Sequence, residues 1–384
     1  MREVYLDNSA TTKVLDEVAK AVFDIMTQSY GNPSSLHGKG IESEKLMRNV
    51  RQKIASVLGV KSNEIYFTSG GTESNNLAIK GTVYNLRRWG NHLITSSIEH
   101  PSVLDVFKAL EKEGFKVTYL KVDKEGFVDL KELIEALTPE TILVSIMHVN
   151  NEVGSVQPIR ELARIIRSQN SNTLFHVDAV QSFGKIPLVL DFEGIDMLSL
   201  SGHKIYGPKG IGALFVREKV KLSPILHGGG QEGGIRSGTE NTPGIVGLGV
   251  AVDAFSGNGD KWENKMAELK KRLMEGILRE IPDAVLNGPV LGAPHILNMS
   301  FPGTRGEILL HSLEAKGIYV STGSACSSHK DGKSHVLKAL GKNYEEQDSA
   351  LRFSLSPFIS TQDIDYTVEV LRYEVTEVRK FVRR

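Results

Sequence analysis

Short apolar segments alternate with amphipathic segments through more than half of this chain. Runs rich in β-branched residues predict strands, which we place at 64–68, 92–97, 116–122, 141–149, 173–178, 196–200 and 211–217. Between them, apolar residues recur at helical spacing and predict helices at 72–84, 102–113, 129–137 and 159–169. Buried strands that alternate with helices are typical of a mostly parallel sheet covered on both faces. The pattern therefore predicts an α/β fold with a seven-stranded sheet.

The pattern changes after a glycine-rich loop at 227–234. A long helical segment at 243–280, which we expect to be broken near Ser256–Gly259, leads away from the sheet. Strands at 295–301, 318–321 and 351–356 then alternate with helices at 306–316, 334–340 and 362–383. Two helices, at 17–26 and 42–58, precede the first strand of the sheet. We expect a large domain at 15–260 and a smaller α+β domain made of 1–14 and 261–384.

Composition excludes several classes of protein. The 384 residues contain 46 basic and 46 acidic side chains, so no overall positive field favours nucleic acid. No segment resembles a signal peptide or reaches the eighteen apolar residues that a membrane span needs. Cys326 is the only cysteine, which rules out an intrachain disulfide. We therefore expect a cytoplasmic protein that binds neither nucleic acid directly nor a membrane.

One loop resembles a phosphate site. The strand at 64–68 runs into Ser69-Gly70-Gly71-Thr72 and then into a helix. A strand, two glycines, a hydroxyl residue and a helix present backbone N–H groups and a positive dipole end to an anion. Taken alone, the segment is better explained as an ordinary N-cap by Thr72 or Ser69.

Further polar residues follow other predicted strands. Asp178 ends the strand at 173–178, with Gln181 close behind it, and Asn151 and His100 follow two neighbouring strands. Ligands of open α/β sheets bind at the carboxyl ends of the strands. A helix N-cap explains Asp178 equally well, and a lone histidine is more often structural.

A lysine completes the series. Ser201-Gly202-His203-Lys204 follows the strand at 196–200, a place where a charge that seeks solvent is unusual. Lys204 alone is more simply explained as a side chain that reaches water. Together, however, a phosphate loop, a stacking histidine, an acid and a lysine are what an enzyme needs to bind pyridoxal phosphate and tune it. The combination predicts a fold-type I pyridoxal-phosphate enzyme.

The motifs carry a closer resemblance. Nearly the whole chain resembles the cysteine desulfurases of the NifS/IscS group, with the motifs in matching order. The segments that match are YLDNSATT at 5–12, YGNPSSLHGKG at 30–40, SGGTESNN at 69–76, HVNNEVG at 148–154, HVDAVQS at 176–182, SGHKIYGPKGIG at 201–212, RSGTEN at 236–241, GSACSS at 323–328 and LRFSLS at 351–356. This group belongs to the class-V aminotransferases of fold type I.

The resemblance implies roles for individual residues. Lys204 would hold the cofactor covalently, Asp178 would face its pyridine nitrogen and His100 its ring. Asn151 and Gln181 would face the phenolic oxygen, and the phosphate would be held by Gly71, Thr72, Ser201 and His203. Thr239 would reach the phosphate of a neighbouring subunit, which implies a homodimer. Arg352 would pair with the carboxylate of the substrate, and Asn32 and residues 8–10 would line the substrate side.

Cys326 decides the reaction that the resemblance implies. Its thiolate would take the sulfur of L-cysteine as a persulfide, leaving alanine. The sulfur would pass to an acceptor, either an iron–sulfur scaffold protein or a tRNA thiolation pathway. In this group the loop cysteine also contributes transiently to a [2Fe–2S] cluster on the scaffold, so Cys326 is the one expected metal ligand.

Other interpretations remain open. A selenocysteine lyase or another fold-type I aminotransferase would use the same lysine and aspartate, and an aminotransferase would not need Cys326. A non-catalytic pyridoxal-phosphate protein that serves as an assembly partner is a third possibility. The joint presence of Lys204, Asp178, His100, Arg352 and Cys326 argues against it.

Overall fold

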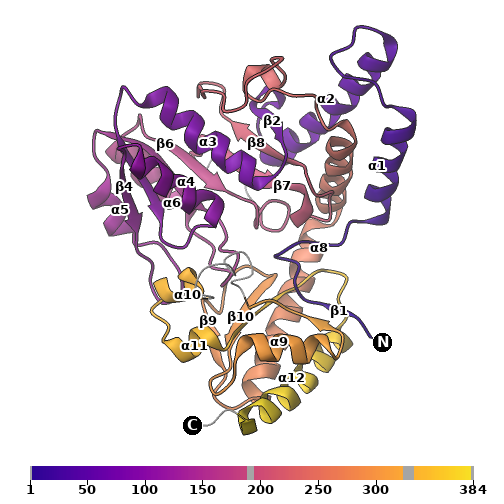
Figure 1. Cartoon of the computed structure of the whole chain (residues 1–384), viewed down its shortest axis with the longest axis vertical. Helices are drawn as coiled ribbons and strands as arrows, with labels where there is room; N and C mark the ends of the chain where they lie inside the picture. Colours follow the sequence, from indigo (N-terminus) through magenta and orange to yellow (C-terminus); the bar gives the residue numbers. More distant parts are fainter. Residues whose placement is uncertain (1, 188–193, 323–332, 382–384) are drawn as a thin grey trace.

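A seven-stranded sheet forms the centre of the larger part of the molecule (Figure 1). This computed structural model describes residues 2–187, 194–322 and 333–381. The order across the sheet is β2-β8-β7-β6-β5-β3-β4, and β8 alone runs against its neighbours. The strands are β2 (Ile65–Thr68), β3 (His92–Ser96), β4 (Lys116–Leu120), β5 (Thr141–Met147), β6 (Leu174–Asp178), β7 (Met197–Ser201) and β8 (Gly212–Val216). The prediction of a mostly parallel sheet is confirmed, and the ends of the strands lie within two residues of the predicted ones.

Helices cover both faces of this sheet because its central strands are buried on both sides. One face packs on α3 (Gly71–Leu86) and α4 (Pro101–Lys112). The other face packs on α2 (Gly38–Leu58), α5 (Leu130–Ala136), α6 (Ile159–Gln169) and the first half of α8 (Thr242–Glu280). The helix α1 (Asp16–Gln28) lies along α8. Within the described ranges, no helix has the length and apolar character that crossing a membrane requires.

A second apolar core gathers the carboxyl-terminal elements. It combines a three-stranded antiparallel sheet, in the order β12-β10-β9, with two helices and the second half of α8. The strands are β9 (Val285–Asn287), β10 (Ile296–Ser300) and β12 (Ala350–Ser354), and the helices are α9 (Gly306–Glu314) and α12 (Thr361–Phe381). The short helices α10 (His335–Ala339) and α11 (Tyr344–Asp348) precede β12 and lie outside this core. The amino-terminal strand β1 (Val4–Tyr5) pairs with β11 (Ile318–Tyr319), so the two ends of the sequence share this core. Where one domain ends and the other begins stays a prediction.

The expected break near Ser256–Gly259 is wrong, because α8 is one helix of 39 residues. Ser256 Oγ donates to the carbonyl of Val252 at 2.9 Å, and Asn258 Nδ2 donates to that of Ala254 at 2.9 Å. These side chains bond back to the preceding turn, as serine can within a helix, and do not draw the backbone into a loop. The continuous α8 therefore links the two cores.

An aromatic cluster fixes the backbone beside Lys204. Tyr206, which has a positive φ of 63°, stacks on Phe255 of α8 with ring centroids 5.6 Å apart. Trp262 and Phe358 meet the Tyr206 ring edge-on at 6.0 and 5.2 Å. A non-glycine residue keeps such a conformation only where its surroundings hold it. The cluster therefore ties the short 3-10 turn η2 (Gly202–Lys204) to α8 and to the smaller unit.

We predict that Phe255→Ala destabilises the protein by about 3–5 kcal/mol, the usual cost of removing a buried phenylalanine side chain. Urea unfolding at neutral pH measures the change. Phe381→Ala is the matched control, because Phe381 is 82% exposed and its loss is expected to change stability by less than about 0.5 kcal/mol. Equal midpoints for both variants would contradict the role given to the cluster.

Candidate active site

A cavity of about 570 Å³ opens at the carboxyl ends of the parallel strands. Loops that follow β2, β3, β5, β6 and β7 line it, together with the amino-terminal arm and Arg352 of β12. Parallel strands end at one edge of a sheet, so residues distant in sequence meet there. The cavity lies at this edge, between the two apolar cores.

The amino-terminal end of α3 forms one wall of the cavity. Gly70 has a φ of 147°, and a Cβ added to Gly71 would lie only 2.5 Å from Val180 Cγ2. Both positions therefore require glycine, and the first-turn N–H groups stay uncovered by side chains. Ser201 Oγ lies beside them, buried and without a hydrogen-bond partner among the described residues. This wall suits an anionic group.

Asp178 lies on the floor of the cavity, where β6 ends. Its Oδ1 accepts from Val180 N at 2.9 Å and its Oδ2 from Asn75 Nδ2 at 2.7 Å. Asn75 Nδ2 also lies 2.9 Å from Ser102 Oγ. Hydrogen bonds to both oxygens of Asp178 fix the orientation of the carboxylate. The buried Asn75 Oδ1 has no partner among the described residues.

His100 is the N-cap of α4, and its partly buried side chain lines the cavity. Nδ1 accepts from Ser102 N at 3.1 Å and lies 2.8 Å from Ser102 Oγ, so the neutral ring carries its proton on Nε2. Burial lowers the pKa of His100, the nearby Lys204 lowers it further, and Asp178 opposes both effects. A neutral, flat imidazole therefore faces the cavity at neutral pH.

The side chain of Lys204 extends from η2 toward the amino-terminal arm. Its Nζ donates to the carbonyl oxygen of Ser9 and, at 2.7 Å, to that of Ala10. Gln181 Nε2 donates to the same Ser9 carbonyl at 3.0 Å, while Gln181 Oε1 has no partner in the described part of the chain. Burial and the neighbouring Lys204 lower the pKa of Lys185 to about 7. Lys204 thus belongs to a region poor in solvent and rich in amines.

Arg352 closes the cavity from the side of the smaller unit. Its side chain is 4% exposed, with Nη2 at 2.7 Å from Asp7 Oδ1 and Nη1 at 3.0 Å from the carbonyl oxygen of Asn151. The buried Nε has no partner among the residues described. A buried guanidinium with a spare N–H is suited to a carboxylate.

Several polar atoms around the cavity thus lack partners among the residues that the structure describes, although buried polar atoms normally have them. They are Asn75 Oδ1, Gln181 Oε1, Ser201 Oγ and Arg352 Nε. An anion cradle, a flat imidazole, an oriented carboxylate and a lysine accompany them. These residues fit pyridoxal phosphate, which is a flat heterocycle with a phosphate and an aldehyde.

Comparisons with known proteins agree with this geometry. The family model for class-V aminotransferases matches residues 4–367. The cysteine desulfurase IscS of Dictyoglomus turgidum is 46% identical over 98% of this chain and 96% of its own length. A solved NifS-like protein superimposes with a TM-score of 0.93 and is 40% identical, over 98% of this chain and all of that one.

The chain belongs to the class-V aminotransferase family. Within that family it belongs with the cysteine desulfurases of the IscS/NifS type, and the resemblance inferred from the motifs is confirmed. Another solved relative, described as SspA in complex with cysteine, is 39% identical over 93% of this chain and all of its own, with a TM-score of 0.83.

Most residues predicted for the family's site lie around this single cavity, namely Gly71, Thr72, His100, Asn151, Asp178, Gln181, Ser201, His203, Lys204 and Arg352. Their individual roles stay predictions. Thr239 is exposed and does not line the cavity of its own chain, and Asn32 is exposed with its Oδ1 accepting from Ser34 N at 2.9 Å. Cys326 lies outside the described residues.

Four residues were absent from the prediction. Asn75 and Ser102 orient Asp178 and His100, Asp7 pairs with Arg352, and Lys185 is a second buried amine. Asn75 follows Gly71 by four residues, so it shares the face of α3 that meets the cavity, and helical spacing could have identified it. Nothing local marks Asp7, because its partner is 345 residues away.

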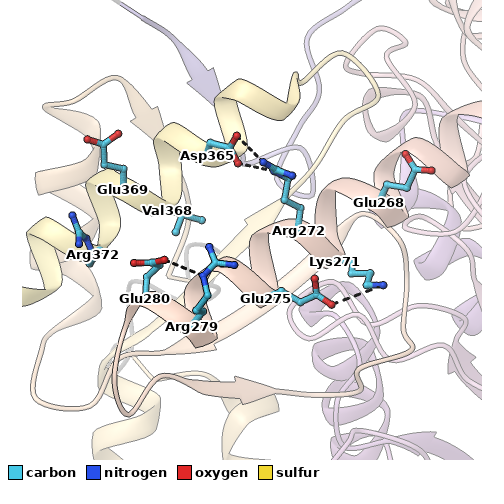
Figure 2. Close-up of a pocket in the computed structure, with 11 residues that line it drawn as sticks. Glu268, Lys271, Arg272, Glu275, Arg279, Glu280, Asp365, Val368, Glu369 and Arg372 are labelled. Carbon is cyan, nitrogen blue, oxygen red and sulfur yellow. Dashed lines mark hydrogen bonds and ion pairs between the residues drawn. The ribbon is translucent and has the colours of Figure 1, made fainter.

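A second groove of about 600 Å³ runs between α8 and α12 in the smaller unit (Figure 2). Acidic and basic side chains alternate along it, and Arg272 binds both carboxylate oxygens of Asp365 at 2.6 and 2.9 Å. Lys271 faces Glu275 at 3.9 Å. Because these charges compensate one another in an exposed setting, the groove is best explained as a solvated junction of two helices.

His176, two residues before Asp178, makes the sheet sensitive to acid. Its Nδ1 and Nε2 lie 2.8 and 2.9 Å from the hydroxyls of Ser145 and Ser199, and burial lowers its pKa to about 3. The unfolded chain takes up this proton near its ordinary pKa of about 6.5, so stability falls as the pH drops from there toward 3.

We therefore predict that lowering the pH from 7 to 5 costs wild type about 2 kcal/mol more than His176→Gln, whose side chain does not titrate. Urea unfolding at the two pH values measures this difference. Because the two proteins share every other titrating group, the difference between their losses reports on His176. An identical loss in both proteins would show that His176 does not stay neutral in the folded state.

Proposed function

We propose that the protein is a pyridoxal-phosphate-dependent cysteine desulfurase that converts L-cysteine to L-alanine and leaves the sulfur as a persulfide on Cys326. The observation that carries the proposal is the meeting of Lys204, Asp178, His100 and Arg352 around one cavity in a chain of this family. The solved relative described as a cysteine complex supports the choice of substrate.

The residues of the cavity divide the work of holding the cofactor. The N-terminal end of α3, with Thr72, Ser201 and His203, would bind the phosphate. Asp178, which Asn75 and the backbone orient, would keep the pyridine nitrogen protonated, while His100 would cover the ring. Pyridoxal phosphate, when bound, withdraws electrons from the Cα of the amino acid joined to it.

The chain's own groups would then bind the substrate and move its protons. The spare Nε of Arg352 would take part in binding the α-carboxylate of L-cysteine. Lys204, which contacts the carbonyls of Ser9 and Ala10 in this structure, would remove the proton from Cα. Because the ring of His100 would be neutral, it would add no positive charge to the cavity.

Sulfur transfer would require the thiolate of Cys326. Its Sγ would attack the sulfur of the substrate, so that an S–S bond forms while the Cβ–S bond breaks. The electron pair of the broken bond would stay with the three-carbon fragment, which takes up a proton and leaves as alanine. The thiolate is the reactive form of cysteine in such an attack.

We test the proposal with purified protein, L-cysteine and a thiol reductant, assaying sulfide and alanine. Wild type should release both in equal amounts. In Cys326→Ala the rate of sulfide release should fall more than about a thousandfold, the scale on which loss of an essential nucleophile acts. It should keep the visible absorption band of the cofactor, which Lys204→Ala should alter.

The other outcomes are decisive. Undiminished sulfide from Cys326→Ala would exclude a persulfide on that residue. A cofactor band without sulfide, together with amino-group transfer to an oxoacid, would favour an aminotransferase. Absence of the band after addition of pyridoxal phosphate would overturn the assignment of Lys204.

We also propose that the enzyme is a homodimer. Large apolar side chains are exposed along α1 and the loop that follows it, where Phe23, Met26, Tyr30 and Leu36 are between 62% and 96% exposed. Such a cluster is typical of an interface. A partner subunit there would accord with the exposed Thr239, which the family resemblance directs to the phosphate of the neighbouring chain.

Sedimentation equilibrium measures the oligomeric state. We expect wild type to sediment as a dimer and the double variant Phe23→Asp/Leu36→Asp to dissociate at least tenfold more readily, because charges would be buried in the interface. Trp89→Asp is the control, since Trp89 is exposed in the turn that follows α3. A monomeric wild type would contradict the proposal.

The sulfur acceptor rests on the family resemblance alone. By that resemblance we propose an iron–sulfur scaffold protein or another acceptor such as a tRNA thiolation pathway. A transient contribution of Cys326 to a [2Fe–2S] cluster belongs to the same proposal. In the described ranges, no three histidine, aspartate or glutamate side chains are grouped so as to hold a metal ion.

A further inference from the structure

A buried carboxyl group next to the cavity has no part in the chemistry set out above. Glu152 follows Asn151 in the loop after β5 and is 4% exposed. Its Oε2 accepts a hydrogen bond from the hydroxyl of Ser334, which is equally buried. Burying a carboxyl group costs free energy unless it is paired, so its retention requires a reason.

Ser334 occupies a defined place in the sequence. It is the N-cap of α10, where its Oγ accepts from Leu337 N at 3.0 Å. It also follows Lys333, where the described chain resumes after the ten residues 323–332 that include Cys326. A cap needs only the lone pairs of the hydroxyl. The proton of that hydroxyl is what Glu152 binds, so the contact joins this point of the chain to the larger domain.

The other end of the same segment is bound nearby. Ser321 and Arg352 exchange backbone hydrogen bonds, with Ser321 N at 3.2 Å from Arg352 O and Arg352 N at 2.6 Å from Ser321 O. The Arg352 side chain donates in turn to the carbonyl of Asn151, the neighbour of Glu152. Both ends of the segment that carries Cys326 are therefore fixed around the proposed carboxylate site of the substrate.

Further contacts hold the residues after Ser334 against the larger domain. His335 Nε2 lies 2.9 Å from the carbonyl oxygen of Glu99. Val336, Leu337 and Leu340 pack on Ile98 and Met147 of the larger domain. Figure 1 shows α10 beside the loops of that domain, although α10 follows the smaller unit's strands in sequence. Cys326 is four residues from Thr322 and eight from Ser334 in the sequence. Chains of four and eight residues span at most about 14 and 28 Å, so the two anchors together limit the region that Cys326 can reach.

We infer that Glu152 and Ser334 are positioning residues for sulfur transfer, because their hydrogen bond fixes the chain at Ser334, eight residues after Cys326 in the sequence. The inference rests on the proposed function. It assigns the pair no contact with substrate or cofactor. Loss of the contact should therefore slow the transfer step while leaving binding of L-cysteine and removal of its Cα proton intact.

The helix cap itself provides the matched control. Asn343 caps α11 in the same unit, and its Oδ1 accepts from Glu346 N at 2.9 Å without a partner from the larger domain. Asn343→Ala therefore removes a cap alone, whereas Ser334→Ala removes a cap and the link to Glu152. Ser334→Thr keeps the hydroxyl and should behave as wild type.

The experiment compares three quantities in Ser334→Ala, Glu152→Ala, the double variant and the controls. For either single variant we expect kcat for sulfide release to fall about tenfold with KM nearly unchanged, the scale on which loss of one hydrogen bond acts. Exchange of the Cα hydrogen of L-alanine for deuterium, which needs Lys204 but no thiol, should be unaffected.

The third quantity does not depend on turnover. Because Cys326 is the only cysteine, the rate of its alkylation by iodoacetamide reports on its surroundings in the resting protein. We expect Ser334→Ala and Glu152→Ala to change that rate several-fold in the same direction, and Asn343→Ala and Ser334→Thr to leave it alone. The double variant should be no slower than either single variant, because the two residues act through one contact.

Three results would overturn the inference. The first is the same kcat and the same alkylation rate in Ser334→Ala as in Asn343→Ala. The second is a double variant whose loss of kcat is the product of the two single losses. The third is a parallel loss of Cα hydrogen exchange, which would point to general disruption of the cavity. Failure of the proposed function is separate, since Cys326→Ala would then retain sulfide release. Glu152→Gln, which keeps an acceptor for Ser334, should behave as wild type, and Ser334→Ala carries the test if Glu152→Ala does not fold.

Discussion

A buried guanidinium holds the two halves of this molecule in register. Arg352 comes from a strand of the smaller unit, yet its side chain binds Asp7 of the amino-terminal arm and the backbone of Asn151 in the larger domain. A buried charge without partners would cost several kcal/mol, so these three segments must come together in the folded protein. That requirement closes one side of the cavity and places the amino-terminal arm over it.

The arm in turn positions the lysine. Backbone carbonyls of Ser9 and Ala10 accept from Lys204 Nζ, and Gln181 binds the first of them as well. The arm stays in place because β1 pairs with β11 and Asp7 binds Arg352. Lys204 and Arg352 are therefore coupled through a few residues at the start of the chain. A cofactor held by the larger domain would meet a substrate held from the smaller one.

Rigid strands and short loops carry the remaining groups. Asp178 and Ser201 end two adjacent parallel strands, and the aromatic cluster around Tyr206 fixes the turn that carries Lys204. Side chains on such supports keep their geometry better than side chains on long loops. Cys326 differs in its sequence setting, which is small and polar, and the contact between Glu152 and Ser334 gives the structure a means of fixing one end of that segment.

The sequence by itself determined the alternation of strands and helices, the parallel sheet and the set of candidate groups at its carboxyl edge. Each of these depends on local periodicity or on motifs of a few residues, such as Gly70-Gly71 before α3. The tertiary structure alone decided that Asn75 orients Asp178, that Asp7 pairs with Arg352 and that α8 runs unbroken through Ser256–Gly259. The reason is physical: hydrogen bonds across 103 or 345 residues leave no periodic trace, and the packing of a helix can override the tendency of its glycines to break it.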